Sequence, residues 1–300
     1  TLLGDSKSMM SIFLFLGASL FHYIADPVAT MRSEPNNQSE IASQAIFSEA
    51  VTLGDTQNDW VYVETPLDHY HGWVKRDALC ERQNHFGLDS SKVYAKVNRL
   101  TAHVYSVTDT IYGPVMSLPY ESKVELIDAE SVNSRWVHVL LCNGQKVYIQ
   151  RGDLDFDMRV LNIDEMCALS TKFLGLPYTF GGRSSFGYDC SGFVQMLYRQ
   201  MGIRLPRDAK DQMKWDGFSP TTLDELSPGD LLFFGASIDR ITHVGLYLHN
   251  GEFIHADVHE NAPYIRINKL SDALWSESDT FPFRTFRTLI DNSGSDTCNS

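Results

Sequence analysis

The feature that most constrains the fold of this 300-residue chain is an internal repeat, because two stretches match each other at an offset of about 75 residues. Each copy contains a Trp-Val-x-Val segment, which starts at Trp60 in the first copy and at Trp136 in the second. An alternating segment precedes each of them, at residues 50–53 and 123–126. Period-two alternation rich in Val, Thr, Tyr and Trp predicts short β-strands separated by turns. Units of roughly 60–70 residues with five or six such strands have the size of a small barrel.

This pattern resembles the bacterial SH3-like domain, here in tandem at residues 24–80 and 92–155. Residues 1–23 precede the pair and contain an apolar run from Ser11 to Phe21. The run is too short for a bilayer, which needs about 20 residues, but it has the length of a signal-peptide core. Because a basic flank and a tidy cleavage site are missing, an export signal and a buried N-terminal element both stay open. The first would place a bacterial protein in the periplasm or cell envelope, and the second in the cytoplasm.

Composition excludes several classes of protein. Hydrophobic residues make up 43% and charged residues 21%, which is typical of a folded globular chain. The 38 acidic and 25 basic residues give a net charge of −13 without a lysine–arginine cluster, so we expect no nucleic-acid partner. The five cysteines include no Cys-x-x-Cys pair, which argues against a zinc ribbon or a disulfide scaffold. We expect no metal and no cofactor.

The spacing of apolar residues in the sequence changes after Asp155. Apolar residues at three- and four-residue spacing predict a helix over residues 163–174, and a second helix is expected over residues 189–201. Helices followed by strand-like segments predict an α+β domain with an antiparallel sheet over residues 160–290, after which residues 291–300 form a polar tail. The predicted strands are residues 230–234, 242–249, 252–256 and 264–267.

Cys190 stands at the start of the second predicted helix, directly after a glycine-rich turn. The unpaired N–H groups and the positive dipole end of a helix N-terminus favour a thiolate, and they can also stabilise an oxyanion. Asp189 is a natural N-cap for this helix. We therefore predict that Cys190 is a reactive nucleophile. The alternative is a buried structural cysteine.

A thiolate peptidase also needs a histidine base and a group that orients this base. His243 and His255 flank a hairpin that has an Asn-Gly pair at its tip. A two-residue turn would place the histidines on opposite faces of the sheet. A three-residue loop that ends in a left-handed glycine would pair Leu248 with Glu252 and bring both histidines to one face, so we predict this loop. The alternative is two unrelated strand histidines.

Five motifs in this order resemble the NlpC family, which comprises papain-like cysteine peptidases of bacterial cell walls. The resemblance implies a papain-like α+β fold, with helices packed on an antiparallel sheet, preceded here by two small SH3-like β-barrels. Tandem SH3-like domains of this kind are similar to those of the subgroup that cuts the bond between γ-D-glutamate and a diamino acid in peptidoglycan. The motifs are residues 178–193, 202–212, 226–234, 243–247 and 253–256.

The resemblance implies a role for each matching residue. Cys190 would be the nucleophile, His243 the general base and His255 the residue that orients His243. Tyr178 would line the site near the oxyanion. The family's usual Tyr-x-Trp-Gly-Gly has Phe180 in place of tryptophan here, which removes an indole N–H donor and puts the shape of the substrate pocket in doubt.

Four further residues are candidates for substrate binding. Asp189 and Ser191 lie beside the nucleophile, and by family analogy Asp189 can meet the free amine of an N-terminal L-alanine. Asp189 could equally serve only as an N-cap. Asp208 either caps the next helix or touches the substrate. The resemblance implies that a tyrosine of the first SH3-like domain closes the substrate cleft. Tyr70 is the candidate for this role, and the alternative is an exposed turn residue.

The sequence thus predicts a cysteine endopeptidase that hydrolyses γ-D-glutamyl–diamino acid bonds in peptidoglycan stem peptides or muropeptides, with diaminopimelate or lysine as the diamino acid. One alternative is an amidase on the same fold that cuts between the sugar and L-alanine. The other is a catalytically inactive cell-wall-binding protein. Intact sacculi and small recycled fragments both stay open as substrates. No integral membrane span is expected.

Overall fold

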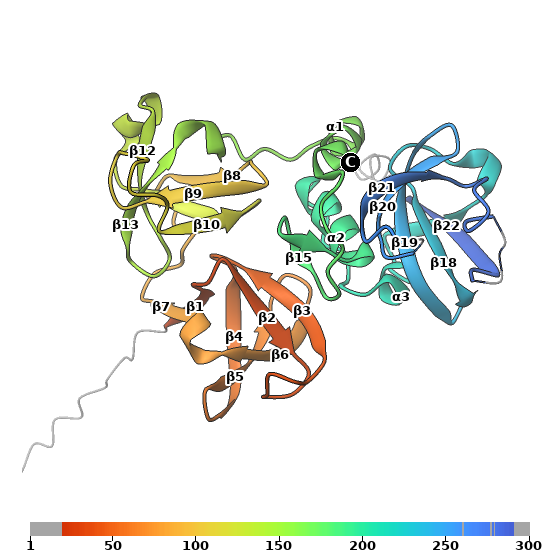
Figure 1. The fold of residues 1–300 in the computed structure, drawn as a ribbon, viewed down its shortest axis with the longest axis horizontal. Helices are drawn as coiled ribbons and strands as arrows, with labels where there is room; N and C mark the ends of the chain where they lie inside the picture. Colours follow the sequence, from red (N-terminus) through yellow and green to blue (C-terminus); the bar gives the residue numbers. More distant parts are fainter. Residues whose placement is uncertain (1–19, 260, 277, 279, 291–300) are drawn as a thin grey trace, which may run out of the picture.

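The computed structural model describes residues 20–290 except 260, 277 and 279. Figure 1 shows three units in sequence order, which we call the first β unit, the second β unit and the C-terminal unit. Most of the predicted N-terminal apolar run and the whole predicted polar tail lie outside the described residues. Within the described part of the chain, every helix is too short or too polar to cross a membrane.

Each β unit is a seven-stranded sheet, and the two sheets have the same topology. The strand order is β3-β2-β6-β5-β4-β1-β7 in the first unit and β10-β9-β13-β12-β11-β8-β14 in the second, so that each strand has its counterpart seven numbers later. The repeat in the sequence is therefore also a repeat in the structure. The first β unit consists of β1 Phe21–Ile24, β2 Val28–Arg32, β3 Ile41–Ile46, β4 Ala50–Gln57, β5 Trp60–Thr65, β6 Tyr70–Lys75, the 3-10 turn η1 Arg76–Ala78 and β7 Leu79–Arg82. The second consists of β8 Tyr94–Val97, β9 Thr101–Tyr105, β10 Met116–Pro119, β11 Lys123–Leu126, η2 Ala129–Asn133, β12 Trp136–Leu140, β13 Lys146–Gln150, η3 Arg151–Asp153 and β14 Leu154–Asp155.

The buried positions explain why the repeated segments form strands. Val61 and Val63 of β5 lie in the core of the first unit, and Val137 and Val139 of β12 lie in the core of the second. All four are at most 1% exposed, and the residues between them face away from the core, as the period of a strand requires. The first sheet begins earlier than predicted, at Phe21, because β1 pairs with both β4 and β7.

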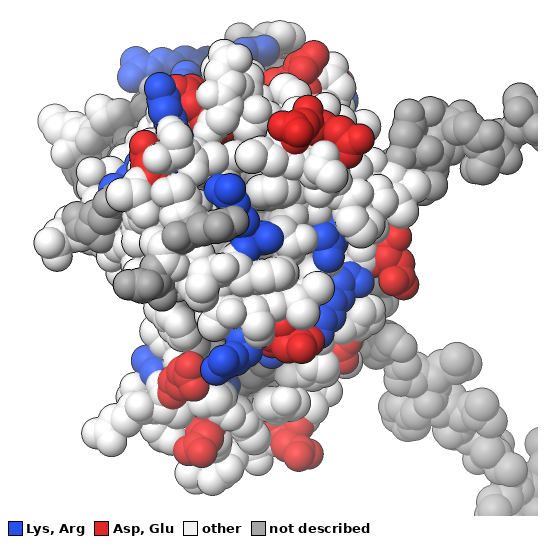
Figure 2. All heavy atoms as spheres, turned by 90° about the vertical axis from the view of Figure 1, so that its right-hand side faces the viewer, with Lys and Arg blue, Asp and Glu red and all other residues white. Residues whose placement is uncertain are grey.

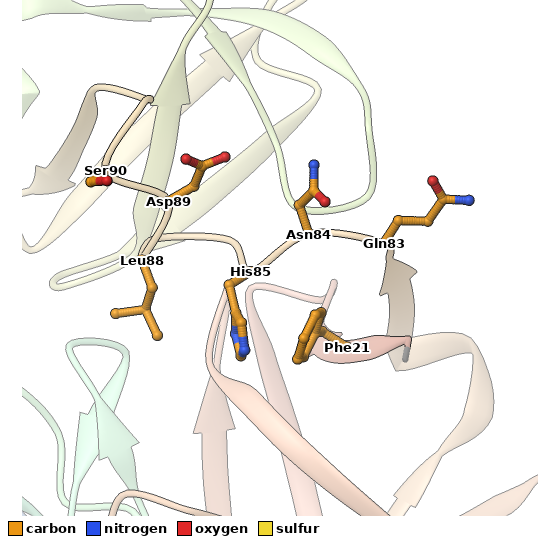
Figure 3. Close-up of a pocket in the computed structure, with 7 residues that line it drawn as sticks. All are labelled: Phe21, Gln83, Asn84, His85, Leu88, Asp89 and Ser90. Atoms are coloured by element: carbon orange, nitrogen blue, oxygen red, sulfur yellow. The ribbon is translucent and has the colours of Figure 1, made fainter. Parts of the chain in front are cut away.

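The connection between the two β units packs back on β1. The ring centroids of Phe21 and His85 are 3.5 Å apart, and the Tyr23 hydroxyl accepts a hydrogen bond from the Phe86 N–H at 2.8 Å. Figure 3 shows Phe21 and His85 at the edge of a hollow of about 450 Å³. None of the candidate site residues lines this hollow, so it belongs to the junction of the β units.

The C-terminal unit packs its helices on an antiparallel sheet, which confirms the α+β prediction. Phe193 and Leu197 of α2 share one core with Val244 and Leu246 of β19. The strand order is β17-β22-β18-β19-β20-β21, and two of these strands, β17 and β22, were not predicted. The elements are α1 Ile163–Ser170, η4 Thr171–Phe173, β15 Arg183–Ser184, β16 Gly187–Tyr188, α2 Cys190–Gln200, α3 Ala209–Gln212, β17 Phe218–Thr221, η5 Leu223–Glu225, β18 Leu231–Ser237, β19 Arg240–His249, β20 Glu252–Asp257, β21 Tyr264–Lys269 and β22 Phe283–Leu289.

The hairpin of β19 and β20 brings His243 and His255 to one face of the sheet, as predicted, but by a different route. Its tip is a two-residue turn whose Asn and Gly both have positive φ, 53° and 77°, as a type I′ turn requires, and His249 pairs with Glu252. Leu248 is then left unpaired as a β-bulge, beyond which the ladder resumes in the predicted register. The predicted three-residue loop is wrong, but its consequence for the histidines is confirmed because the bulge changes the parity by one residue.

Charged side chains are mixed on the face that the C-terminal unit presents in Figure 2. Several basic side chains run across the middle of this face, and acidic side chains lie above, beside and below them. This face is therefore not one continuous acidic surface.

Candidate active site

Cys190 is the first residue of α2, and Asp189 is its N-cap, with Oδ1 accepting a hydrogen bond from the Gly192 N–H at 2.7 Å. A side chain at position 192 would place its Cβ 2.2 Å from the carbonyl oxygen of Gly182. The first turn of α2 can therefore approach the glycine-rich loop only because residue 192 is glycine. This approach fixes the position of Cys190, which is 7% exposed.

The Cys190 thiol is protonated in these surroundings. Burial and the Asp189 charge raise its pKa to about 12, although hydrogen bonds with the backbone of Val244 and Ser191 act in the opposite direction. Our expectation that the helix N-terminus holds Cys190 as a thiolate is therefore wrong for the substrate-free protein, because desolvation outweighs the helix N–H groups. A base has to take the proton when the sulfur attacks.

A chain of hydrogen bonds leads through the sheet to His243. Nε2 of His243 lies 2.8 Å from Nδ1 of His255, and Nε2 of His255 lies 3.1 Å from Oδ1 of Asn268. Nδ2 of Asn268 donates a hydrogen bond to the Asp272 carboxylate at 2.8 Å. This bond lowers the pKa of Asp272, and because a carboxylate only accepts, it fixes the orientation of the Asn268 amide.

The direction of donors and acceptors along these hydrogen bonds determines which nitrogen of His243 is basic. Because Oδ1 of Asn268 accepts, Nε2 of His255 carries the proton and Nδ1 of His255 is an acceptor. His243 then donates from Nε2, which leaves the lone pair on its Nδ1. The contact of the Cys190 thiol with the Val244 N–H places the sulfur beside the strand residue that follows His243. His243 is thus held as a neutral base next to a thiol.

Burial keeps both histidines neutral near pH 7. It lowers the pKa of His243 well below its ordinary value, and it lowers that of His255 to about 4, although the Asp257 carboxylate acts in the opposite direction on both. The ring of Trp275, which is 1% exposed, lies 5.1 Å from the ring of His243, and the Phe281 ring lies 6.0 Å away. These aromatic walls exclude water from the base.

Three of these side chains, His243, His255 and Asp257, bring one possible metal ligand each within 4.8 Å of one another. Both nitrogens of His255 belong to the chain described above, Nε2 of His243 does too, and the two oxygens of Asp257 already contact His259 and Arg266. The cluster is explained by hydrogen bonding, and the absence of a metal requirement stays a prediction.

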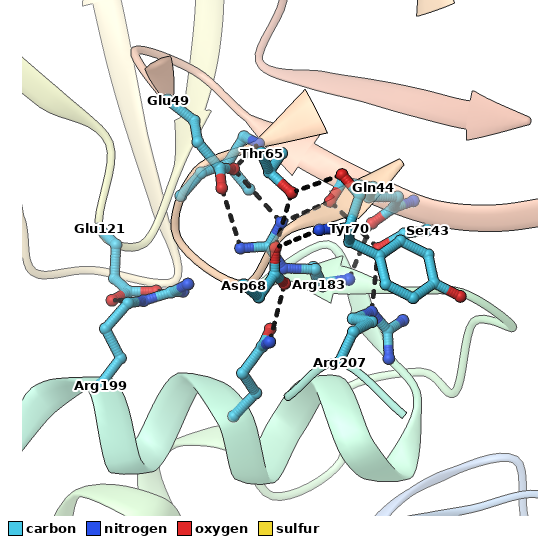
Figure 4. A network of polar contacts seen from close by, with 12 residues as sticks. Ser43, Gln44, Glu49, Thr65, Asp68, Tyr70, Glu121, Arg183, Arg199 and Arg207 are labelled. Carbon is cyan, nitrogen blue, oxygen red and sulfur yellow. Dashed lines mark hydrogen bonds and ion pairs between the residues drawn. The ribbon is translucent and has the colours of Figure 1, made fainter. Parts of the chain in front are cut away.

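Asp189 and Ser191 are both turned toward Arg207, which the sequence analysis did not single out although it lies within the quoted motif 202–212. The guanidinium of Arg207, 2% exposed, donates to the two oxygens of Asp189 at 3.0 and 2.6 Å and to Ser191 Oγ at 2.9 Å. It also donates to Ser43 of the first β unit at 2.9 Å, a contact drawn in Figure 4. Asp189 is thus both the N-cap and one half of a buried ion pair.

Tyr70 of β6 reaches from the first β unit to the C-terminal unit. Its hydroxyl donates to Oδ1 of Asp208 at 3.3 Å, and burial together with the Asp208 charge raises the pKa of Tyr70 to about 12. Asp208 is the N-cap of α3 but its side chain makes no capping bond, and 35% of that side chain is exposed. In the loop before β6, Asp68 accepts a hydrogen bond from Gln195 of α2 at 2.8 Å. The first β unit therefore forms one wall beside the N-terminal half of α2.

Two arginines, Arg183 buried and Arg199 half-buried, join the β units to the C-terminal unit, as Figure 4 shows. Arg183, 1% exposed, pairs with Glu49 of the first β unit at 3.0 Å. Arg199 of α2 pairs with Glu121 of the second. Both β units are thus anchored to the segment that carries Cys190.

Tyr178 and Phe180 have different surroundings. Tyr178 is half-buried, and burial, together with the charge of the Cys190 thiolate when it forms, raises the pKa of the phenol. Phe180 is 58% exposed. The Phe180 ring, which stands where the family's motif usually has tryptophan, therefore faces solvent.

Known proteins resemble this chain along most of its length. A model described as the NlpC/P60 family matches residues 175–284, and one described as the bacterial dipeptidyl-peptidase Sh3 domain matches residues 31–79. Two curated relatives, both named gamma-D-glutamyl-L-lysine dipeptidyl-peptidase, are each 30% identical to this chain. The match covers 73% of this chain and 68% of the relative for Bacillus cereus, and 72% of each for Bacillus subtilis.

Solved structures show the same fold. The crystal structure of an NlpC/P60 family protein from Bacillus cereus superposes with a TM-score of 0.77, covering 90% of this chain and 99% of that chain at 24% identity. The site geometry, the matched models and the relatives agree. This chain belongs to the NlpC/P60 family, as a cysteine peptidase with an SH3 domain of the bacterial dipeptidyl-peptidase type in its first β unit.

Proposed function

We propose that this protein is an endopeptidase that hydrolyses the bond between γ-D-glutamate and a diamino acid in peptidoglycan stem peptides. The observation that carries the proposal is the hydrogen-bond chain through His255, which leaves Nδ1 of His243 as a proton acceptor one residue before Val244, whose backbone meets the Cys190 thiol. The names of the two curated relatives support the choice of bond.

In the proposed reaction, Nδ1 of His243 takes the thiol proton as the sulfur of Cys190 attacks the γ-carbonyl carbon of the glutamate. The N–H groups at the start of α2 stabilise the oxyanion. His243 then gives its proton to the amine of the diamino acid as the C–N bond breaks, which leaves a thioester. Water, deprotonated by the same nitrogen, hydrolyses the thioester and releases the dipeptide.

We assign the free amine of an N-terminal L-alanine to Asp208 and Tyr70. Asp189, the other candidate, is neutralised by the bidentate pair with Arg207, whereas the Asp208 side chain is partly exposed and meets Lys210 only at 3.8 Å. An ammonium group is stabilised by a carboxylate whose charge is not already offset by a close bidentate partner. This assignment favours small peptides with a free N-terminus over intact sacculi.

The test is mass spectrometry of L-Ala-γ-D-Glu-diaminopimelate and of the lysine tripeptide after incubation with the protein. We expect a free diamino acid and the dipeptide from the wild type, and a loss of about 10⁴-fold or more in kcat/KM for Cys190→Ala. Cys167→Ala, in a half-buried cysteine of α1, is the matched control and should keep full activity.

The outcomes separate the alternatives. Full turnover by Cys190→Ala would refute the mechanism. Release of an intact stem peptide from a muropeptide would indicate the amidase, and binding of muropeptides without turnover would indicate an inactive cell-wall-binding protein. Cleavage of sacculi as fast as the free tripeptide would refute the assignment of the amine to Asp208 and Tyr70.

A further inference from the structure

Two cysteines from different units touch each other at the junction of the β units. Cys80 lies on β7 of the first unit, and Cys142 follows β12 of the second. Cys142 lies within one hydrophobic cluster and Cys80 packs against that cluster, and each thiol shifts the pKa of the other. Cys80 pairs with Tyr23 of β1, the residue before Ile24. Cys142 is buried and Cys80 is half-buried, so one sulfur of the pair is within reach of solvent.

Other contacts fix the position of Cys142 independently. Its Sγ lies 3.2 Å from the carbonyl oxygen of Ile24, in the strand β1 that pairs with β7. Arg82, two residues after Cys80, donates hydrogen bonds to the carbonyl oxygens of Leu141 and Cys142 at 3.3 and 3.4 Å. The loop that carries Cys142 is thus held against β1 and β7 from two sides.

We propose that Cys80 and Cys142 are a cross-linking site, at which a disulfide joins the first β unit to the second. The other two cysteines that the structure describes are Cys167 and Cys190, and burial together with a neighbouring carboxylate raises the pKa of each thiol. The proposal rests on the junction of the β units and not on the reaction at Cys190. The sequence argues against a fold that depends on disulfides, and the proposal does not contradict this. Each β unit already folds around a hydrophobic core, and the single disulfide would only join the two units.

The chemistry is thiol–disulfide exchange with a low-molecular-weight disulfide such as glutathione disulfide. The hydrogen bond from Cys142 lowers the pKa of Cys80, so the more exposed sulfur attacks as the thiolate and releases one glutathione. Cys142 then attacks the mixed disulfide, forms the S–S bond and releases the second glutathione. The protein loses two protons and two electrons, and the glutathione disulfide takes them up as two thiols.

The cross-link would close a ring of contacts. The first β unit is anchored to the C-terminal unit through Arg183, and the second through Arg199. A bond between Cys80 and Cys142 would join the two β units directly to each other. Because the first β unit carries Tyr70 to the cleft, the cross-link would hold one wall of the site in place.

The experiment is peptide mapping without reductant after incubation of the full chain in glutathione buffers of increasing oxidation and alkylation of the remaining thiols. Trypsin releases residues 77–82 with Cys80 and residues 136–146 with Cys142. We expect these two peptides as one disulfide-linked species, in about tenfold excess over any other cysteine pair, because the two thiols are held together. Reductant should separate them.

Variants and an unfolded control make the test specific. Cys80→Ser and Cys142→Ser should lose the linked species, and Cys167→Ser should keep it. Both peptides alkylated in every buffer, or found only as glutathione adducts, would overturn the proposal. An equal yield of the linked species from the chain in urea would also overturn it, since the folded contact would then make no difference.

Discussion

The two β units share one topology, but they use the same loop to contact different neighbours. In the first unit the loop between β5 and β6 carries Asp68 to α2 and leads into Tyr70 at the cleft. In the second unit the equivalent loop, between β12 and β13, turns to the first β unit, where Leu141 accepts a hydrogen bond from Arg82. A shared fold therefore contacts the C-terminal unit through this loop in one copy and the other β unit in the second, and under the proposed function only the first contact faces the substrate.

The anchors of the two units, in contrast, are alike. The turns before β4 and β11 each contain a residue with positive φ, Ser48 at 66° and Glu121 at 74°. Each turn also supplies a carboxylate to an arginine of the C-terminal unit, from Glu49 to Arg183 and from Glu121 to Arg199. Attachment is thus common to both units, and the contact of Tyr70 with Asp208 is what distinguishes the first.

The largest effects are expected at the anchors, and they should be similar in both units. Arg183→Met and Arg199→Met each leave a carboxylate buried without its partner, which we expect to lower the free energy of unfolding by about 3–5 kcal/mol. Urea unfolding measures this loss. Arg159→Met, in an exposed ion pair with Glu165, is the control and should change stability little. A loss confined to one anchor would contradict the equivalence of the units.

Acid should destabilise the C-terminal unit through His255. The pKa of His255 is about 4 in the folded chain, against an ordinary value of 6.5. Between pH 6.5 and 4, His255 therefore binds a proton in the unfolded chain but stays neutral in the folded chain. Stability is therefore full above pH 6.5 and falls by about 3 kcal/mol as the pH drops to 4. Urea unfolding between pH 7.5 and 4 should show this slope in the wild type, and His255→Gln should reduce it.

The fall of activity at low pH, the acid limb of the pH profile, also tests the difference between the β units and the C-terminal unit. Because burial lowers the pKa of His243, activity should persist below pH 6.5 and fall only as His243 becomes protonated. Tyr70→Phe should leave this limb where it is, since the burial of His243 arises within the C-terminal unit. A half-maximal rate at or above pH 6.5 would contradict the burial argument.

A smaller effect is expected from Tyr70→Phe on substrate binding. Loss of the hydroxyl removes the hydrogen bond to Asp208, and we expect KM for the free-amine tripeptide to rise about tenfold with little change in kcat. An N-acetylated tripeptide should show no such difference. Tyr112→Phe, on an exposed side chain of the second β unit, is the control. Equal effects of the two variants would remove the distinction between the units.

The smallest effect is expected in the loop between β9 and β10 of the second unit. Ile111 is 77% exposed there, so Ile111→Ser should change the free energy of unfolding by less than about 0.5 kcal/mol. Its kcat/KM for the tripeptide should equal that of the wild type. A clear loss of turnover would show that the second unit also takes part in binding this substrate.

Local patterns were sufficient to predict most of the fold. The repeat predicted the strands around Trp60 and Trp136, the three-four spacing predicted α1, and Asp189 as an N-cap predicted the start of α2. The parity of the hairpin predicted that His243 and His255 share a face. These features depend on neighbours in sequence, or on one turn, so their signal lies within a short window.

The rest depends on contacts between distant segments. Asn268 meets His255 only because of the register of β20 and β21, and Arg207 meets Asp189 only once α2 and the following loop are packed. The protonation of Cys190 was predicted wrongly because the amount of burial is a property of the whole fold. A helix terminus can be read from sequence, whereas desolvation cannot.

The bulge at Leu248 takes up one residue of the chain without moving the histidines. Deletion of Leu248 would leave His249 opposite Glu252 and Tyr247 opposite Phe253, so His243 would keep the face that it shares with His255. A residue lost between His243 and Leu246 would instead turn His243 to the other face of the sheet, although no residue of the site would have been replaced. In a lineage of such genes, a codon lost at the bulge would thus be silent for the base, whereas a codon lost a few positions earlier would give a folded protein without one.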